Sequence, residues 1–125
     1  MVKVVLMLCT GGLSSQLFLK SVMRAAEDNG YKVAIDFGSV LYNREMSAQY
    51  SGLDYLFLYA PATEITKDAL ETAYLTIDTV MISPQVRYMS NSIKTIAQEY
   101  TIKCLLLEPE TFAELAGKEC FEIIK

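Results

Sequence analysis

The chain has 125 residues, of which 52% are hydrophobic and 21% are charged, and its formal net charge is −4. These values are typical of one globular domain, 1–125, and argue against a disordered chain. The acidic balance disfavours a nucleic-acid partner, because phosphate backbones are bound with surplus Lys and Arg.

Targeting and metal-binding signals are weak in this sequence. The apolar N-terminus is short and is followed at once by polar residues and glycines, so it predicts a strand and not a signal peptide. No apolar run approaches the roughly 20 residues of a membrane-spanning helix. Three cysteines with no histidine and no CxxC pair predict neither a disulfide framework nor a metal site, and we expect no cofactor. We therefore expect a cytoplasmic protein without membrane insertion, and Met1 favours a free-standing subunit.

The first half of the chain predicts a strand, a helix and a second strand. Val2–Leu8 is almost continuously apolar, as in a parallel strand that is covered on both faces. A helix follows from Leu13 to Asn29 and ends at the Asn29-Gly30 pair. Lys32–Phe37 predicts the next strand, and Gly38–Gly52 a loop with a short helix around Glu45–Tyr50. The first helix should face the sheet with Leu17, Phe18, Val22, Ala25 and Ala26.

The second half repeats this alternation. Leu53–Tyr59 predicts a strand, Thr63–Leu75 a helix and Thr79–Ile82 another strand. Ser83 is expected to cap a helix that has Pro84 at its first position. The apolar positions of that helix are Val86, Met89, Ile93, Ile96, Ala97 and Tyr100. The last elements are a strand at Ile102–Leu107 and a helix at Glu110–Ile124, interrupted near Gly117.

Strands and helices that alternate in this way predict βαβ units. The expected fold class is α/β: a flavodoxin-like, doubly wound, open parallel sheet of four to five strands with helices on both faces. Ligands bind such sheets at the carboxyl ends of the strands.

The loop after the first strand is the candidate site, because it starts at Cys9 and continues with small and hydroxyl residues into a helix. Its further residues are Thr10, Gly11, Gly12, Leu13, Ser14 and Ser15. Glycines let backbone N–H groups converge on an anion, and the helix dipole favours a thiolate. The pattern therefore indicates a phosphate cradle with Cys9 as phosphoryl acceptor. The alternative is that Cys9 is a buried hydrophobic residue in an ordinary turn.

A cysteine phosphatase of low molecular weight is a competing interpretation. Those enzymes clamp the phosphoryl oxygens with an arginine six residues after the nucleophile, where this chain has Ser15. Without a bidentate clamp, hydrolysis lacks its main electrostatic stabiliser. A third interpretation is a non-catalytic regulatory domain with a relic of the site. Cys104 and Cys120 are expected to serve packing.

Two segments resemble a known family, the enzyme IIB component of the lactose/cellobiose (chitobiose) type in the bacterial sugar phosphotransferase system. The segment Val4–Ser15 is similar to the family's strand followed by C-[ST]-x-G-[ML]-S-[ST]. The segment Thr79–Met89 is similar to the family's apolar strand followed by G-P-Q-[IV]-x-Y-M. The resemblance implies that a phosphohistidine of the partner IIA phosphorylates Cys9. Phosphocysteine would then phosphorylate a sugar held by the membrane component IIC.

The resemblance also implies that the loop with Pro84 and Gln85 lies beside the Cys9 loop. Ser83 stands where the family has glycine, and Gly11 where a small non-glycine residue is usual. The segment Leu53–Leu75 is extra, either an inserted βα unit or a rearranged crossover. The sequence does not name the sugar.

Overall fold

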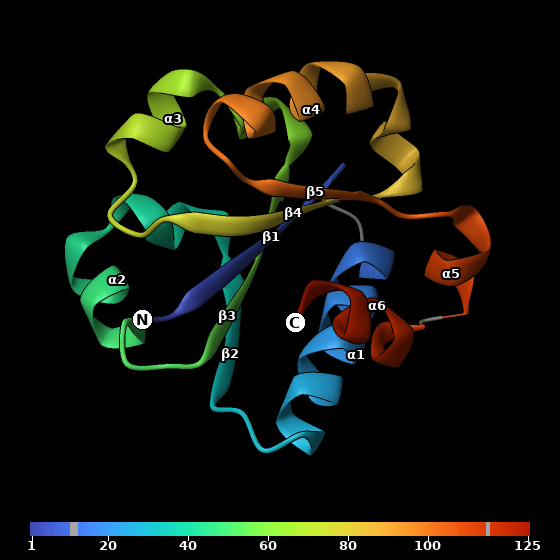
Figure 1. The fold of residues 1–125 in the computed structure, drawn as a ribbon, viewed down its shortest axis with the longest axis horizontal. Coiled ribbons are helices and arrows are strands. Elements are labelled where there is room, and N and C mark those ends of the chain that lie inside the picture. The colour runs from blue at the N-terminus through green and yellow to red at the C-terminus, as the bar shows by residue number, and fades with distance from the viewer. Residues whose placement is uncertain (11–12, 115) are drawn as a thin grey trace.

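The computed structural model describes residues 1–10, 13–114 and 116–125. Within these residues, parallel strands form one five-stranded sheet in the order β2-β3-β1-β4-β5 (Figure 1). The strands are β1 (Lys3–Cys9), β2 (Val33–Phe37), β3 (Tyr55–Pro61), β4 (Ile77–Ile82) and β5 (Lys103–Leu106). The predicted α/β sheet is confirmed, with strand ends that shift by up to two residues.

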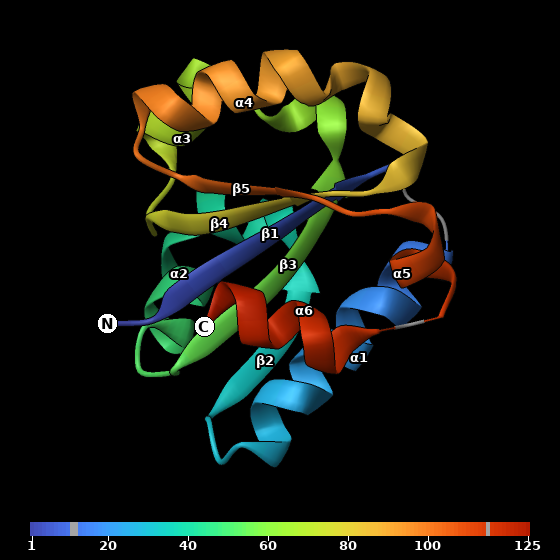
Figure 2. The same ribbon diagram turned by 45° about the vertical axis from the view of Figure 1, so that its right-hand side comes forward.

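Helices cover both faces of the sheet. The α-helices are α1 (Leu13–Asp28), α2 (Arg44–Tyr50), α3 (Lys67–Thr72), α4 (Ser90–Glu99), α5 (Pro109–Ala113) and α6 (Gly117–Ile124). The described residues also form the short 3₁₀ helices η1 (Gly38–Tyr42), η2 (Ala62–Glu64) and η3 (Pro84–Met89). Figures 1 and 2 show α3 and α4 on one side of the sheet and α1 and α6 on the other. Among the described residues, no helix combines the length and the apolarity needed to cross a membrane.

The segment Leu53–Leu75 contains β3, an internal strand of the sheet, followed by η2 and α3. β3 lies between β2 and β1 and pairs with both of them along its length. Without β3, the order is β2-β1-β4-β5, which is how the first strands of a flavodoxin-like sheet are arranged. The segment Leu53–Leu75 therefore supplies an internal strand of the sheet and not an edge strand.

The central strand β1 divides the core into two layers. Its side chains alternate between the two faces, as a strand requires. Val4, Leu6 and Leu8 pack with η1, η3 and α4, whereas Val5 and Met7 pack with α1 and α6. All five of these side chains are at most 5% exposed. β1 is consequently covered on both faces, as its continuous apolar sequence predicts.

The helix predicted at Thr63–Leu75 is shorter than expected. Thr63–Leu75 contains only η2 and α3, because the side chain of Thr66 caps a later start by accepting from the N–H of Ala69. The chain is extended at Ala73, and the N–H of Tyr74 donates to the carbonyl of Leu41. At the C-terminus, the interruption predicted near Gly117 separates α5 from α6.

Two side-chain predictions are wrong. Leu17 does not face the sheet; it is 47% exposed, because helical geometry places it on the same stripe as Lys20 and Arg24. Ser83 precedes η3 without a side-chain capping hydrogen bond. The chain first forms η3, with a non-helical Val86, and the regular helix α4 begins only at Ser90.

Candidate functional site

Cys9 is the last residue of β1, at the carboxyl edge of the sheet. We expected the strand to end at Leu8, but its pairing with β3 continues to Cys9, which lies opposite Pro61. The Cys9 side chain is 1% exposed, and its Sγ lies 3.8 Å from the carbonyl oxygen of Ala60, to which the thiol donates. The cysteine therefore sits in the middle of the sheet, where strands on both sides end beside it.

The predicted cradle leads from Cys9 into α1. Thr10 is exposed and lies in a bend, whereas Ser15 is 2% exposed within the first turn of the helix. Leu13 and Ser14 begin α1, and the cradle glycines Gly11 and Gly12 lie outside the described residues. The first turn of α1 holds no Asp or Glu, so the helix itself places no carboxylate at the positive end of its dipole. An anion in front of this 16-residue helix would be stabilised.

The second sequence segment lies directly beside the first. The N–H of Ser83 donates to the carbonyl of Leu8 at 3.0 Å, and η3 packs against β1. Pro84 is half-buried and Gln85 is exposed at this edge. The chain thus brings the Pro-Gln segment next to the residue that precedes Cys9.

Two features of this edge were not anticipated from the sequence. The first is Ala60, whose carbonyl accepts a hydrogen bond from the Cys9 thiol. The only sequence signal for this contact was the apolar run that Pro61 ends, which predicted a strand but not its neighbour. The second is the Ser83 hydroxyl, which is fully buried and has no hydrogen-bond partner among the described residues. Gly38, which follows β2, also approaches this edge, since a Cβ there would lie 2.9 Å from the Ala60 Cβ.

The other cysteines lie away from the Cys9 loop. Cys120 on α6 is 2% exposed, its Sγ lies 3.4 Å from the Sδ of Met81, and burial raises the pKa of its thiol to about 11. Burial also raises the pKa of Cys104, which nearby Lys94 lowers to a smaller extent. Both environments favour the neutral thiol, in agreement with a packing role.

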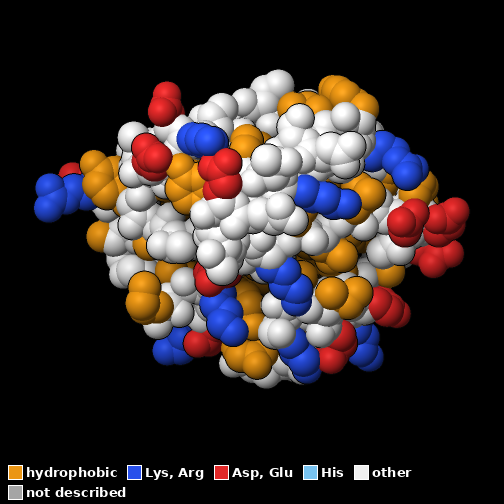
Figure 3. Space-filling view, turned by 45° about the horizontal axis from the view of Figure 1, so that its top comes forward, with side chains coloured by type: hydrophobic (Ala, Val, Ile, Leu, Met, Phe, Trp, Pro, Cys, Tyr) orange, Lys and Arg blue, Asp and Glu red, His pale blue; other side chains and the backbone are white. Residues whose placement is uncertain are grey.

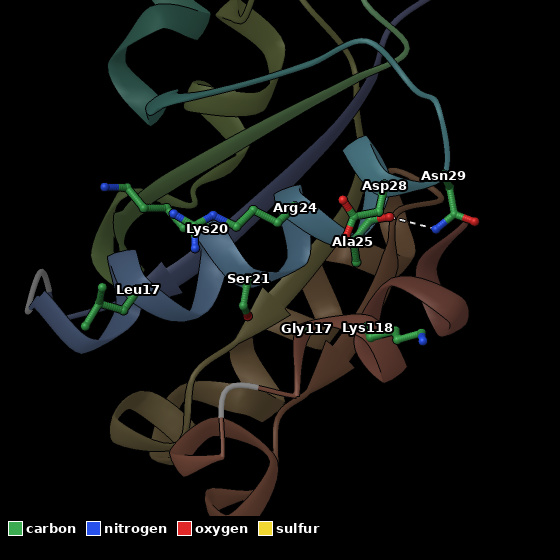
Figure 4. Close-up of a pocket in the computed structure, with 9 residues that line it drawn as sticks. All are labelled: Leu17, Lys20, Ser21, Arg24, Ala25, Asp28, Asn29, Gly117 and Lys118. Atoms are coloured by element: carbon green, nitrogen blue, oxygen red, sulfur yellow. Dashed lines mark hydrogen bonds between the residues drawn. The ribbon is translucent and has the colours of Figure 1, made fainter.

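A separate groove of about 570 Å³ lies between α1 and α6. Lys20 and Arg24 line it from α1 and Lys118 from α6, together with the carboxylate of Asp28 (Figure 4). Cys9, Pro84 and Gln85 do not line this groove. The groove is large, but because none of these three residues lines it, we do not take it as the site of phosphoryl transfer.

Charge on the surface is mixed. Figure 3 shows Lys and Arg side chains interspersed with Asp and Glu on the face that carries α3 and α4. One pair on this face is Lys67 of α3 with Glu99 of α4, whose charged atoms are 3.0 Å apart. This face offers no broad basic surface of the kind that nucleic-acid backbones require.

Comparison with known proteins shows similarity of fold and no match to a protein family by sequence. No protein-family model and no curated protein sequence matches the chain. The lactose-specific IIB component domain of the phosphoenolpyruvate:carbohydrate phosphotransferase system from Streptococcus pneumoniae aligns over 99% of this chain and 95% of its own, with a TM-score of 0.66 and 13% identity. The likeness is one of fold. It confirms the α/β fold that the alternation of strands and helices predicts.

Two further solved structures are similar. A de novo designed PLOOP2X3_50 fold protein aligns over 99% of this chain and 94% of its own, with a TM-score of 0.64 and 19% identity. A GTPase from Pyrococcus abyssi, in its apo form, aligns over 96% of this chain and 72% of its own, with a TM-score of 0.53 and 12% identity. Fold likeness therefore extends to proteins of different kinds, and function has to be argued from the site.

Proposed function

We propose that this chain is a phosphoryl carrier, an enzyme IIB of a sugar-import phosphotransferase system. Cys9 receives a phosphoryl group from a phosphohistidine of a IIA protein. It passes the group to a sugar bound by the membrane component IIC. The protein would then be a cytoplasmic transferase that itself carries phosphocysteine, with no cofactor.

The position of Cys9 in the fold carries this proposal. In a fold similar to a lactose-specific IIB domain, Cys9 stands at the carboxyl end of the central strand, ahead of the N-terminus of α1. The segment Ser83-Pro84-Gln85, which also matches the family pattern, lies beside it through the hydrogen bond from Ser83 to Leu8. The chain has no histidine, so a histidine donor would have to belong to a partner.

The proposed transfer needs no oxidant or metal. In the first step the P–N bond of the phosphohistidine breaks, an S–P bond forms at Cys9, and the thiol proton leaves to the released imidazole. In the second step the S–P bond breaks, a P–O bond forms to a sugar hydroxyl, and the proton of that hydroxyl passes to the cysteine sulfur. The positive end of α1 would stabilise charge on the phosphoryl oxygens in both steps.

The site favours transfer over hydrolysis. A cysteine phosphatase would need its arginine at the position of Ser15, which here is a small side chain buried in the first turn of α1. Arg24 lies more than two helical turns further along and lines the groove between α1 and α6. Neither residue supplies the bidentate clamp that hydrolysis uses.

The decisive experiment is to incubate the protein with a phosphorylated IIA partner and to locate the label. Mass spectrometry under mild conditions that keep a thiophosphate intact should place one phosphoryl group on Cys9. Cys9→Ser should abolish this labelling, whereas the matched variant Cys104→Ser should retain it. Labelling of Cys9→Ser at the wild-type level would refute the proposal. Turnover of an aryl phosphate that alkylation of Cys9 abolishes would instead indicate a phosphatase.

A further inference from the structure

The hydroxyl of Ser83 is the one buried side-chain oxygen or nitrogen among the described residues that lacks a hydrogen-bond partner. The residue is 0% exposed. A buried hydroxyl without a partner destabilises a folded protein, and such groups are rare in native structures. The Ser-Pro sequence is a capping signal, but this hydroxyl makes no capping bond. Its burial therefore calls for another explanation.

Strand register places Ser83 beside Cys9. Leu8 pairs with Ile82, and the bond from the Ser83 N–H to the Leu8 carbonyl extends this parallel ladder by one residue. The next residues along the two strands are Cys9 and Ser83. Neighbouring strands lie about 4.8 Å apart, so the two side chains are adjacent.

Both side chains point to the face that α1 covers. Met7 and Met81 are paired on β1 and β4 and pack together with residues of α1, such as Phe18. Cys9 and Ser83 each follow these methionines by two residues, and a period of two returns a side chain to the same face. The Ser83 side chain thus lies on the α1 face of the sheet, next to that of Cys9.

We propose that the Ser83 hydroxyl donates a hydrogen bond to an oxygen of a phosphate group held in front of Cys9. This inference rests on the proposed function, and it explains why this chain keeps a hydroxyl at a position where the IIB pattern has glycine. Three elements then hold the phosphate: β1 through Cys9, β4 through Ser83, and α1 through its N-terminus. Donation to the anion satisfies the hydroxyl, and no bond other than the hydrogen bond changes.

The test uses Ser83→Ala and two measurements, stability without phosphate and affinity for phosphate, of which only the affinity should fall. Without phosphate, removal of an unpaired buried hydroxyl should leave the thermal midpoint of unfolding equal to or above that of the wild type. Affinity for inorganic phosphate, followed by ³¹P NMR titration, should fall by about tenfold, as expected for loss of a hydrogen bond to a charged group. The control Thr79→Val changes a buried residue of β4 on the same face, four positions earlier, and should leave phosphate affinity unchanged.

The outcomes separate this inference from the proposed function. Equal phosphate affinity in the wild type and Ser83→Ala, or no phosphate binding by the wild type, would overturn the role of Ser83 even if Cys9 is labelled by IIA. Absence of label on Cys9 would overturn the proposed function, while the titration still decides whether Ser83 contacts phosphate. A lowered affinity in Ser83→Ala with retained stability supports the inference, since a purely structural hydroxyl would not produce it.

Discussion

Gly117, the first residue of α6, lies against the backbone of Ser21 on α1. A Cβ at position 117 would overlap the Ser21 backbone, so only glycine allows the two helices to approach so closely. Gly117→Ala should therefore lower the free energy of unfolding by about 1–3 kcal/mol, the usual effect of overpacking. Urea unfolding measures this loss.

Gly52→Ala is the matched control for this substitution. A Cβ at Gly52 meets no atom within 4 Å, so its effect on the free energy of unfolding should be within about 0.5 kcal/mol. Equal stability of Gly117→Ala and the wild type would show that α6 can move away from α1 without loss.

Thr101, two residues after the end of α4, has a backbone conformation that suits glycine better. Its φ is 57°. Thr101 lies within the turn that closes when the N–H of the next residue, Ile102, donates to the carbonyl of Ala97. A β-branched residue is strained in this left-handed region. Thr101→Gly should raise the free energy of unfolding by about 1 kcal/mol.

The equivalent turn after α1 offers the reciprocal test. Gly30 holds that position with a φ of 88°. Gly30→Ala should lower the free energy of unfolding by about 1 kcal/mol, and urea unfolding measures this change and that of Thr101→Gly. A destabilised Thr101→Gly would mean that the threonine side chain contributes more than its backbone strain removes.

Cys120 should make stability fall at alkaline pH. Burial raises the pKa of its thiol to about 11, above the value of about 9 expected when the chain unfolds. The neutral thiol is favoured in the folded state, so its contribution is complete below pH 9 and is lost as pH rises towards 11. Between pH 8 and 10.5, the wild type should lose about 2 kcal/mol that Cys120→Ala does not lose.

The difference between the pH profiles of the wild type and Cys120→Ala isolates the contribution of the Cys120 thiol to stability. The pKa of Tyr50 is also raised, by its hydrogen bond to Asp36 and by burial, but Tyr50 titrates equally in both. Parallel pH profiles of unfolding free energy would contradict the prediction for Cys120.

Sequence predicted the strands well because each is a short apolar run bounded by turn residues. It could not place β3, since an apolar run shows that a strand is buried but does not name its neighbours. Internal pairing with β1 and β2 is a consequence of tertiary packing. The prediction for Leu17 was wrong for a related reason. An apolar side chain in a helix suggests burial, but its angular position around the axis of α1 determines whether it faces the sheet or the solvent.

The position of the candidate site could be predicted from the sequence, but the contacts around it could not. A cysteine and small residues between a strand and a helix identified the loop, and order along the chain put it at the carboxyl edge. The environment of Ser83 was not predictable, because the same Ser-Pro pair serves equally well as a helix cap. Only the continued ladder between β1 and β4 turns that serine towards Cys9.

Gln85 provides a further test of the second segment. It is exposed on η3, one residue after Pro84, at the edge where Cys9 would receive its phosphoryl group. If its amide contacts the transferred group, Gln85→Ala should slow labelling of Cys9 by phosphorylated IIA by about tenfold, without a change in the thermal midpoint. Rapid-quench labelling measures that rate.

Gln98→Ala is the control for Gln85, because this glutamine is also exposed but lies near the C-terminal end of α4. Its labelling rate should match that of the wild type. The concentration dependence then shows how Gln85 acts: a lower maximal rate indicates contact with the transferred phosphoryl group, whereas a higher half-saturating IIA concentration alone indicates contact with the partner. Wild-type rates in Gln85→Ala at all IIA concentrations would leave Pro84 and Gln85 as the start of η3 and nothing more.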